Sequence, residues 1–394
     1  MIRRWLLAEG AGAAALPLLL GRALRAFADG YVAILLPAYL LALGFGTAEV
    51  GIIATATLLG SALATLAVGA WGHRFRQRKL LLGAALLMAA TGVSFAVPSS
   101  FWPLLLIAFI GTLNPSSGDV SVFLPLEHAR LSEIASGEAR TALFARYSLL
   151  GALFAALGAL AVVLPDHLEA QLGVTRLEAL RAMFLLYGLI GGAVWLLYRG
   201  LPEFHAEEPR LRLAALFSVD AFAGGLVLHS LMALWLFQRF NLSLAAAGTF
   251  FFWVGVLTAA SQLAAPQLAK RIGLLNTMVF THIPASLCLI AAAFATSLEA
   301  VLGLLLLRAL LSQMDVPARA AFVMAVVTPA ERSAAASFTA VPRSLAAALS
   351  PALGGAMFAA GWLAAPLVAC GILKIAYDLT LWRVFRTVAT SHRD

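Results

Sequence analysis

The chain has 394 residues, of which 62% are hydrophobic and only 12% are charged, and its net charge is +8. A soluble domain could not cover so much apolar surface, so the composition excludes a soluble globular protein and indicates that lipid is the solvent. The positive charge follows from the orientation of the chain in a membrane, argued below, and needs no nucleic-acid partner.

Apolar stretches of about 20 residues, the length of a membrane-spanning helix, recur along the whole chain. The first starts near residue 17 and has no convincing cleavage site after it, so it reads as a spanning helix rather than a signal peptide. We therefore predict an all-α membrane protein with twelve spans. In chain order they lie at 17–43, 47–72, 79–97, 102–126, 140–164, 180–198, 212–237, 244–269, 274–296, 300–327, 333–360 and 363–385.

The connections on one side of these spans hold most of the Lys and Arg residues, which makes that side cytoplasmic and places both termini there. The longest polar connection in mid-chain, "YRGLPEFHAEEPRLR" (198–212), divides the spans six and six. "RAFADG" from Arg25 and "DAFAGG" from Asp220 share Ala-Phe-Ala-x-Gly, which indicates a repeat. We expect an N-terminal bundle at 1–198, a cytoplasmic linker at 199–211 and a C-terminal bundle at 212–394.

The connection "GAWGHRFRQRK" (69–79) resembles the basic loop motif of the major facilitator superfamily (MFS), Gly-x-Leu-Ala-Asp-Arg-x-Gly-Arg-Lys. A weaker copy of that motif would fall at "PQLAKRIG" (266–273). His73 stands where the family has an Asp that helps to close the inner gate, so that latch is in question here. Arg74, Arg78 and Lys79 supply the basic positions of the loop.

In length and lack of extra helices the chain also resembles the bacterial efflux branches of this superfamily. The resemblance implies two pseudo-symmetric six-helix bundles that rock about a central cavity, walled chiefly by the first, fourth, seventh and tenth helices. It places the protein in the bacterial cytoplasmic (inner) membrane.

Ionised side chains inside spans are costly and usually face a cavity or each other. Twelve such residues fall inside the predicted spans: Arg22, Arg25, Asp29, Asp119, Arg146, Asp220, Arg308, Asp315, Arg319, Arg343, Lys374 and Asp378.

Some of these charges can be paired by depth, at a helical rise of about 1.5 Å per residue. Asp315 lies about 18 Å from the cytoplasmic end of its helix and Arg343 about 17 Å from the end of the next, so we predict that they form an ion pair. By the repeat, Asp119 and Arg146 form the equivalent pair. Such pairs can contribute to gating by breaking and reforming.

Asp29 and Asp220 are the candidate carriers of a coupling proton, because they lie on helices expected to wall the cavity. Asp29 is slightly favoured, since Gly30 would leave room for water to reach it. A static Arg25–Asp220 bridge between the halves is the alternative reading. His229 is either a second proton or metal site or a packed polar residue.

Candidate substrate contacts are of two kinds. Arg25, Arg308 and Arg319 could hold a carboxylate or phosphate, whereas Tyr31, Tyr39, Trp235 and Phe237 would suit an amphipathic molecule. In "TLNPSSGD" (112–119), Asn114, Ser116 and Ser117 lie beside a helix-breaking Pro115, which frees backbone carbonyls or merely kinks the helix.

No phosphate-binding loop, nucleophile elbow or zinc-protease motif is present in the sequence. The two cysteines, Cys288 and Cys370, fit core packing, and no cofactor or metal is expected. The sequence therefore predicts no enzyme but a secondary transporter, a monomer that exchanges protons for a small organic solute and exports it. Uptake or exchange of an organic anion is the alternative. A metal-cation exporter built on Asp29, Asp220 and His229, or a non-transporting sensor, ranks lower.

Overall fold

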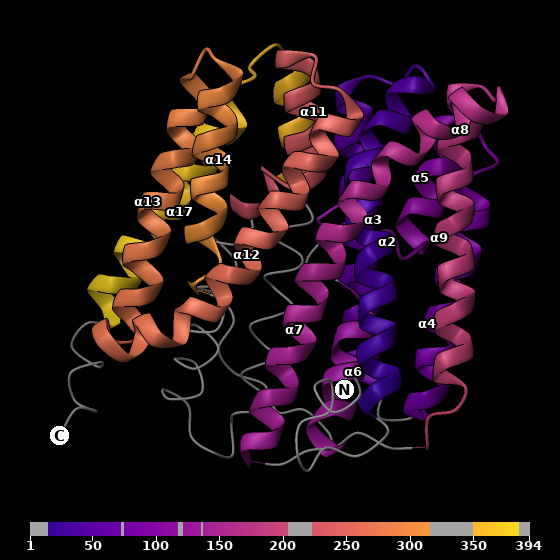
Figure 1. Cartoon of the computed structure of the whole chain (residues 1–394), viewed down its shortest axis with the longest axis horizontal. Coiled ribbons are helices and arrows are strands. Elements are labelled where there is room, and N and C mark those ends of the chain that lie inside the picture. Colours follow the sequence, from indigo (N-terminus) through magenta and orange to yellow (C-terminus); the bar gives the residue numbers. More distant parts are fainter. Residues whose placement is uncertain are drawn as a thin grey trace.

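The computed structural model describes residues 15–71, 75–116, 121–134, 137–203, 223–315 and 350–385. These ranges are helical apart from short connections, and eight of their helices are long and apolar enough to cross a membrane. In Figure 1, α13, α14 and α17 lie together on one side and α2, α4, α7 and α9 on the other. The expected all-α membrane architecture is therefore present.

The described part of the first half contains eight α-helices and one 3-10 turn. Its short α8 ends at Gly173, whose φ of +65° lets the chain turn, and α9 starts on a capping box made by Thr175 and Glu178. The elements are α2 (Ala15–Ala42), α3 (Thr47–Trp71), α4 (Gln77–Phe95), α5 (Phe101–Ile110), α6 (Phe123–Ile134), α7 (Gly137–Leu160), η2 (Ala161–Val163), α8 (Leu164–Leu172) and α9 (Arg176–Tyr198).

The predicted fourth span is interrupted. Helix α5 ends at Ile110, the chain is non-helical at 111–116, and α6 begins at Phe123. Pro115, which has no N–H to donate, lies in a turn within this break. The interruption expected at Pro115 is confirmed, but it is wider than a kink, and the span extends past its predicted end at 126 to Ile134.

The second half follows the predicted spans where it is described. The seventh span is also broken, because residues 223–225 are helical, 226–228 are not, and α11 begins only at His229. Residues 350–359 are helical within the predicted eleventh span. The named helices are α11 (His229–Phe240), α12 (Leu244–Ile272), α13 (Leu274–Phe294), α14 (Leu298–Ser312) and α17 (Ala365–Phe385).

Helix α2 packs along α7 with almost no space between the two backbones. A Cβ placed on Gly30 would lie 2.1 Å from the carbonyl oxygen of Ala155, and one on Gly158 would lie 2.0 Å from that of Phe27. The space beside Gly30 is therefore filled by α7. The expectation that this glycine leaves room for water beside Asp29 is wrong.

The two halves also meet through small residues. A Cβ on Gly51 of α3 would lie 2.9 Å from the Cα of Gly355, and the N–H of Ala352 donates to the hydroxyl of Thr55 at 2.7 Å. Helix α3 leads into the basic loop at 73–79, so Gly51, near its other end, lies toward the predicted non-cytoplasmic side. Gly248 of α12 meets α7 and η2 in the same close way.

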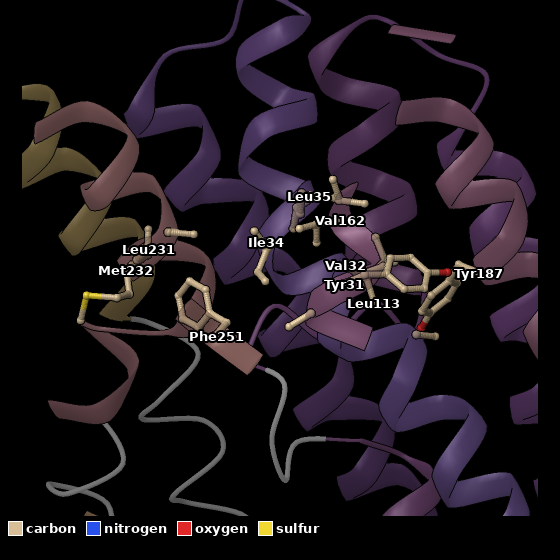
Figure 2. Close-up of a cluster of buried hydrophobic side chains, with 14 of the residues drawn as sticks. Tyr31, Val32, Ile34, Leu35, Leu113, Val162, Tyr187, Leu231, Met232 and Phe251 are labelled. Atoms are coloured by element: carbon tan, nitrogen blue, oxygen red, sulfur yellow. The ribbon is translucent and has the colours of Figure 1, made fainter. Parts of the chain in front are cut away.

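One large apolar cluster links the halves. It contains Tyr31, Ile34 and Leu113 from the first half and Leu231 and Phe251 from the second, as Figure 2 shows. The outward surface is apolar as well. Large side chains that are more than half exposed include Val97, Trp102, Leu106, Leu189 and Trp362. An apolar exterior around a partly polar centre is the arrangement that a bilayer requires.

Candidate functional site

Arg25 of α2 forms a buried ion pair with Glu127 of α6. Its Nη2 lies 2.5 Å from both carboxylate oxygens, and the two side chains are 3% and 0% exposed. The Arg25 guanidinium also lies 4.0 Å from the centre of the Phe123 ring. Glu127 is thus the acid that pairs with Arg25 among the described residues. Asp220, the partner of Arg25 in the alternative reading, lies outside the described residues.

Two tyrosines complete the surroundings of Glu127. The hydroxyl of Tyr147 on α7 donates to one carboxylate oxygen, and the hydroxyl of Tyr198 on α9 donates to the other. Gly21 of α2 gives Tyr198 room, because a Cβ there would lie 2.2 Å from its hydroxyl oxygen. Glu127 thus joins four helices of the first half. It was not among the predicted site residues, because the fourth span was expected to end at 126.

Asp29 lies one helical turn beyond Arg25 on α2 and is 8% exposed. The amide of Asn114, in the break after α5, hydrogen-bonds its carboxylate. The Asn114 oxygen in turn accepts from the backbone N–H of Ser116 at 3.1 Å and from its hydroxyl at 2.6 Å. Ser116 and Asn114, in the break of the fourth span, therefore form a chain of hydrogen bonds that ends at Asp29 of the first span.

The same break contacts the second half. The N–H of Ser230 donates to the carbonyl oxygen of Pro115 at 3.2 Å, and the ring of His229 hydrogen-bonds the backbone of Ser116. We call Asp29, Asn114, Ser116 and His229 the central polar network. It runs from α2 through the break in the fourth span to the start of α11, so it crosses between the halves.

Arg308 of α14 extends this network. It is half-buried and lies close enough to His229 for the two to interact electrostatically, with Cys288 and Cys370 as its other such neighbours. The structure thus brings together residues from the four helices expected to wall the cavity. Arg319 lies outside the described residues.

Two of the aromatic candidates are placed in apolar packing. Tyr39 is fully buried, its ring lies 4.8 Å from that of Phe184 on α9, and its hydroxyl donates to the carbonyl of Phe95 at 3.2 Å. It therefore packs inside the first half, away from the second. Trp235 of α11 is also fully buried, with the Arg239 guanidinium 5.3 Å from its ring centre. Its indole N–H has no hydrogen-bond acceptor among the described residues.

Arg22 of α2 is 9% exposed and has no carboxylate partner among the described residues. Its guanidinium carbon lies 5.2 Å from the centre of the Tyr147 ring. Gly151 of α7 leaves the space, because a Cβ there would lie 2.6 Å from the Arg22 Nε.

The predicted gating pairs are only partly described. Asp315 is buried at the end of a described range, and Arg146 is half-buried on α7. Their expected partners, Arg343 and Asp119, lie outside the described residues. Both pairs stay predictions.

His73 and Arg74 of the motif loop also lie outside the described residues. Arg78 donates to the carbonyl of Arg199, and Arg76 lies 3.3 Å from Glu203 in an exposed ion pair. Lys79 is exposed. The loop therefore contacts the start of the linker after α9.

A second polar cluster lies between α13 and α17. His282 Nδ1 is 3.0 Å from Asp378 Oδ2, and Lys374 Nζ is 3.4 Å from His282 Nε2. The neutral ring can donate to the acid and accept from the lysine, so it connects two opposite charges spaced one turn apart on α17. Lys374 and Asp378 were among the charges predicted inside spans, whereas His282 was not predicted.

Two recesses are formed by described residues. The larger, of about 610 Å³, is formed around Arg239, Gly361 and Trp362. There the Arg239 guanidinium donates to the carbonyls of Ala293 and Ala295 at 2.6 and 2.8 Å. The smaller, of about 240 Å³, lies between α3 and α4 and is also lined by Gly111 and Thr112 of the break in the fourth span.

Residues 18–232, more than half of the chain, match the family model described as Major Facilitator Superfamily. The chain belongs to the Major Facilitator Superfamily. It is therefore a secondary transporter of this superfamily and not an enzyme, and the predicted fold class is confirmed.

Similar proteins extend the match over nearly the whole MFS chain. A yeast protein from Saccharomyces cerevisiae, "Uncharacterized membrane protein YJR124C", is 22% identical over 410 residues, 92% of each chain. Because this relative is eukaryotic, the predicted bacterial efflux branch and bacterial inner membrane are not supported by it.

Two solved structures share the fold. That of a D-xylose-proton symporter has a TM-score of 0.72 at 16% identity and covers 93% of this chain and 97% of its own. That of the nucleoside transporter NupG has a TM-score of 0.71 at 13% identity, with coverage of 95% and 100%. Identities this low show the fold and leave substrate and direction open.

Proposed function

We propose that this MFS protein moves a small organic solute by proton-coupled alternating access and that Asp29 carries the coupling proton. In this proposal the two predicted halves, 1–198 and 212–394, rock against each other. The observation that carries it is the central polar network, in which a buried acid of the first helix is tied through Asn114 and Ser116 to His229 of the other half.

The neighbourhood of Asp29 supports a titrating role. Arg25, the cation one turn away, is already neutralised by Glu127 and does not form an ion pair with Asp29. A buried carboxylate with an amide neighbour and no ion pair among the described residues can exist in either protonation state. Because the contacts at Pro115 and Ser116 cross between the halves, rocking would break them and change the surroundings of Asp29.

The direction of transport follows from how proton and solute are linked. Export by antiport, in a bacterial inner membrane, is the direction that we inferred from the sequence, and it requires proton and solute to compete for the centre. Uptake of an organic anion requires them to bind together. Arg22, a buried cation without a carboxylate partner among the described residues, favours the second candidate.

The test is pH-driven flux in proteoliposomes after a thermal-shift screen has found a transported solute. We expect Asp29→Asn to bind and exchange that solute but not to accumulate it when a pH difference is imposed. Asp166→Asn is the matched control, since Asp166 is exposed and paired with Arg176. Asp220→Asn tests the other candidate acid. If both central variants keep wild-type dependence on the pH gradient, neither acid carries the coupling proton; if the wild type itself shows no such dependence, the protein is a uniporter or an anion exchanger.

A further inference from the structure

Arg22 is a buried cation on the same helix as Asp29, and it has no carboxylate in an ion pair with it among the described residues. Asp29 is the acid that interacts with it electrostatically, whereas Glu127, the partner of Arg25, is saturated. Each of its oxygens accepts one bond from Arg25 and one from a tyrosine hydroxyl. A carboxylate offers about four acceptor positions, so none is left for Arg22.

Counted over the described residues, the charges around Asp29 balance in only one protonation state. Arg22 and Arg25 are cations, and Glu127 and Asp29 are acids. The sum is zero when Asp29 is ionised and +1 when Asp29 is protonated. Other polar groups that face Asp29 are neutral in their usual forms: Asn114, Tyr31 and Tyr187. Arg22 and Asp29 lie seven residues apart on α2, which places them on the same face about 10 Å apart.

We propose that Arg22 binds the carboxylate or phosphate group of the transported solute, and that this anion and the proton on Asp29 bind together and travel as symport. The inference rests on the proposed function of Asp29. A guanidinium presents paired N–H donors that match both oxyanions. The Arg22 side chain lies in the space that Gly151 leaves and packs against the Tyr147 ring, and these contacts fix its position.

The energetic logic is that of linked binding. A proton on Asp29 removes the negative charge that offsets Arg22, and the anion restores the balance. Each ligand therefore raises the affinity for the other by the same factor. The loaded centre carries no net charge, which lowers the cost of exposing it to the low-dielectric transition between access states.

Arg308 is the rival site, since it is also a cation without an ion pair among the described residues. Its electrostatic neighbours are His229 and two cysteines rather than an acid. An anion there would not be linked to a proton on Asp29 through a shared charge balance. The two sites can therefore be separated by mutation.

The experiment measures binding to the purified full chain in detergent free of phospholipid, by isothermal titration calorimetry at pH 6, 7 and 8. The probes are benzoate and phenyl phosphate, with benzamide and benzyl alcohol as neutral analogues. We expect wild-type protein to bind at least one anion and neither neutral analogue. Affinity for benzoate, whose charge is constant from pH 6 to 8, should rise as pH falls, by up to tenfold per pH unit, the limit for one linked proton.

Five variants decide the site. Arg22→Gln should lose tenfold or more in affinity, and Arg22→Lys should retain part of it. Arg308→Gln should lose less affinity than Arg22→Gln and keep the dependence on pH, and the exposed Arg176→Gln should bind as wild type. Asp29→Asn places a neutral amide where the acid was, so it should bind benzoate tightly with no dependence on pH from 6 to 8. This variant keeps the test informative if Arg22→Gln fails to fold.

The proposal is wrong if neither anion binds, if a neutral analogue binds equally well, or if Arg308→Gln abolishes binding while Arg22→Gln does not. It is also wrong if affinity in Asp29→Asn varies with pH as in wild type. Should anion binding fail while Asp29→Asn still abolishes pH-driven flux, the proton role of Asp29 stands. If pH-driven flux persists in Asp29→Asn, the proposed function itself is wrong.

Discussion

Replacing Glu127 by glutamine should destabilise the protein strongly. The substitution leaves Arg25, 3% exposed, without its counter-charge, and an amide cannot accept from Arg25 and both tyrosines as the carboxylate does. Breaking a buried ion pair from one side costs about 3–5 kcal/mol. Tyr198→Phe removes a single bond to a charged acceptor and should cost less, about 1.5–3 kcal/mol.

The decisive variant is the double substitution, Glu127→Gln with Arg25→Gln, which removes both charges. We expect it to lie within about 2 kcal/mol of wild type, because no isolated charge remains in the interior. Stability would be measured by SDS-induced unfolding in detergent micelles, followed by the fluorescence of the eight tryptophans. Arg176→Gln breaks an exposed ion pair and should cost at most about 1 kcal/mol. If the double variant costs the sum of the two single ones, Arg25 and Glu127 are not coupled and the reasoning fails.

Three further predictions concern gating. Gly51→Leu should abolish flux without unfolding the protein, because no side chain fits between α3 and 350–359. Gly192→Leu, with open space around it, should transport normally. Equal flux in both variants would contradict the packing argument. Asp315→Asn combined with Arg343→Gln should be better folded than either single variant by thermal shift, and no recovery would exclude the pair. His73→Ala should keep near wild-type flux, unless this residue has taken over the latch role of the family's Asp.

The sequence predicted the spans well because lipid demands long apolar runs, and a run such as Gln77–Phe95 has few other readings. It also predicted the interruption of the fourth span beside Asn114 and Ser116, since Pro115 has no N–H for a helical hydrogen bond. What it lacked was the partner of Arg25. Depth along a predicted span gives the height of a charge but not the direction in which it points.

Glu127 was predictable from a different signal. It lies on the buried face of α6 with Phe123, Leu126 and Leu131, at helical spacing, so its face periodicity marks it as internal. Treating it as a loop charge after the fourth span hid that pattern. His282 was missed because it is one uncharged polar residue in an apolar run, and only the approach of α17 gives it partners.

The interruption of the fourth span also bears on how the chain enters the membrane during synthesis. Helix α5 has 10 residues and α6 has 12, so at about 1.5 Å per residue neither crosses a core of about 30 Å by itself. Helix α6 also carries Glu127, and an acid at mid-membrane costs an inserting segment about 2.5–3.5 kcal/mol. The apolar α5 must supply most of the driving force for insertion. Helix α2, synthesised earlier and holding Arg25, provides the partner that retains α6 once it arrives.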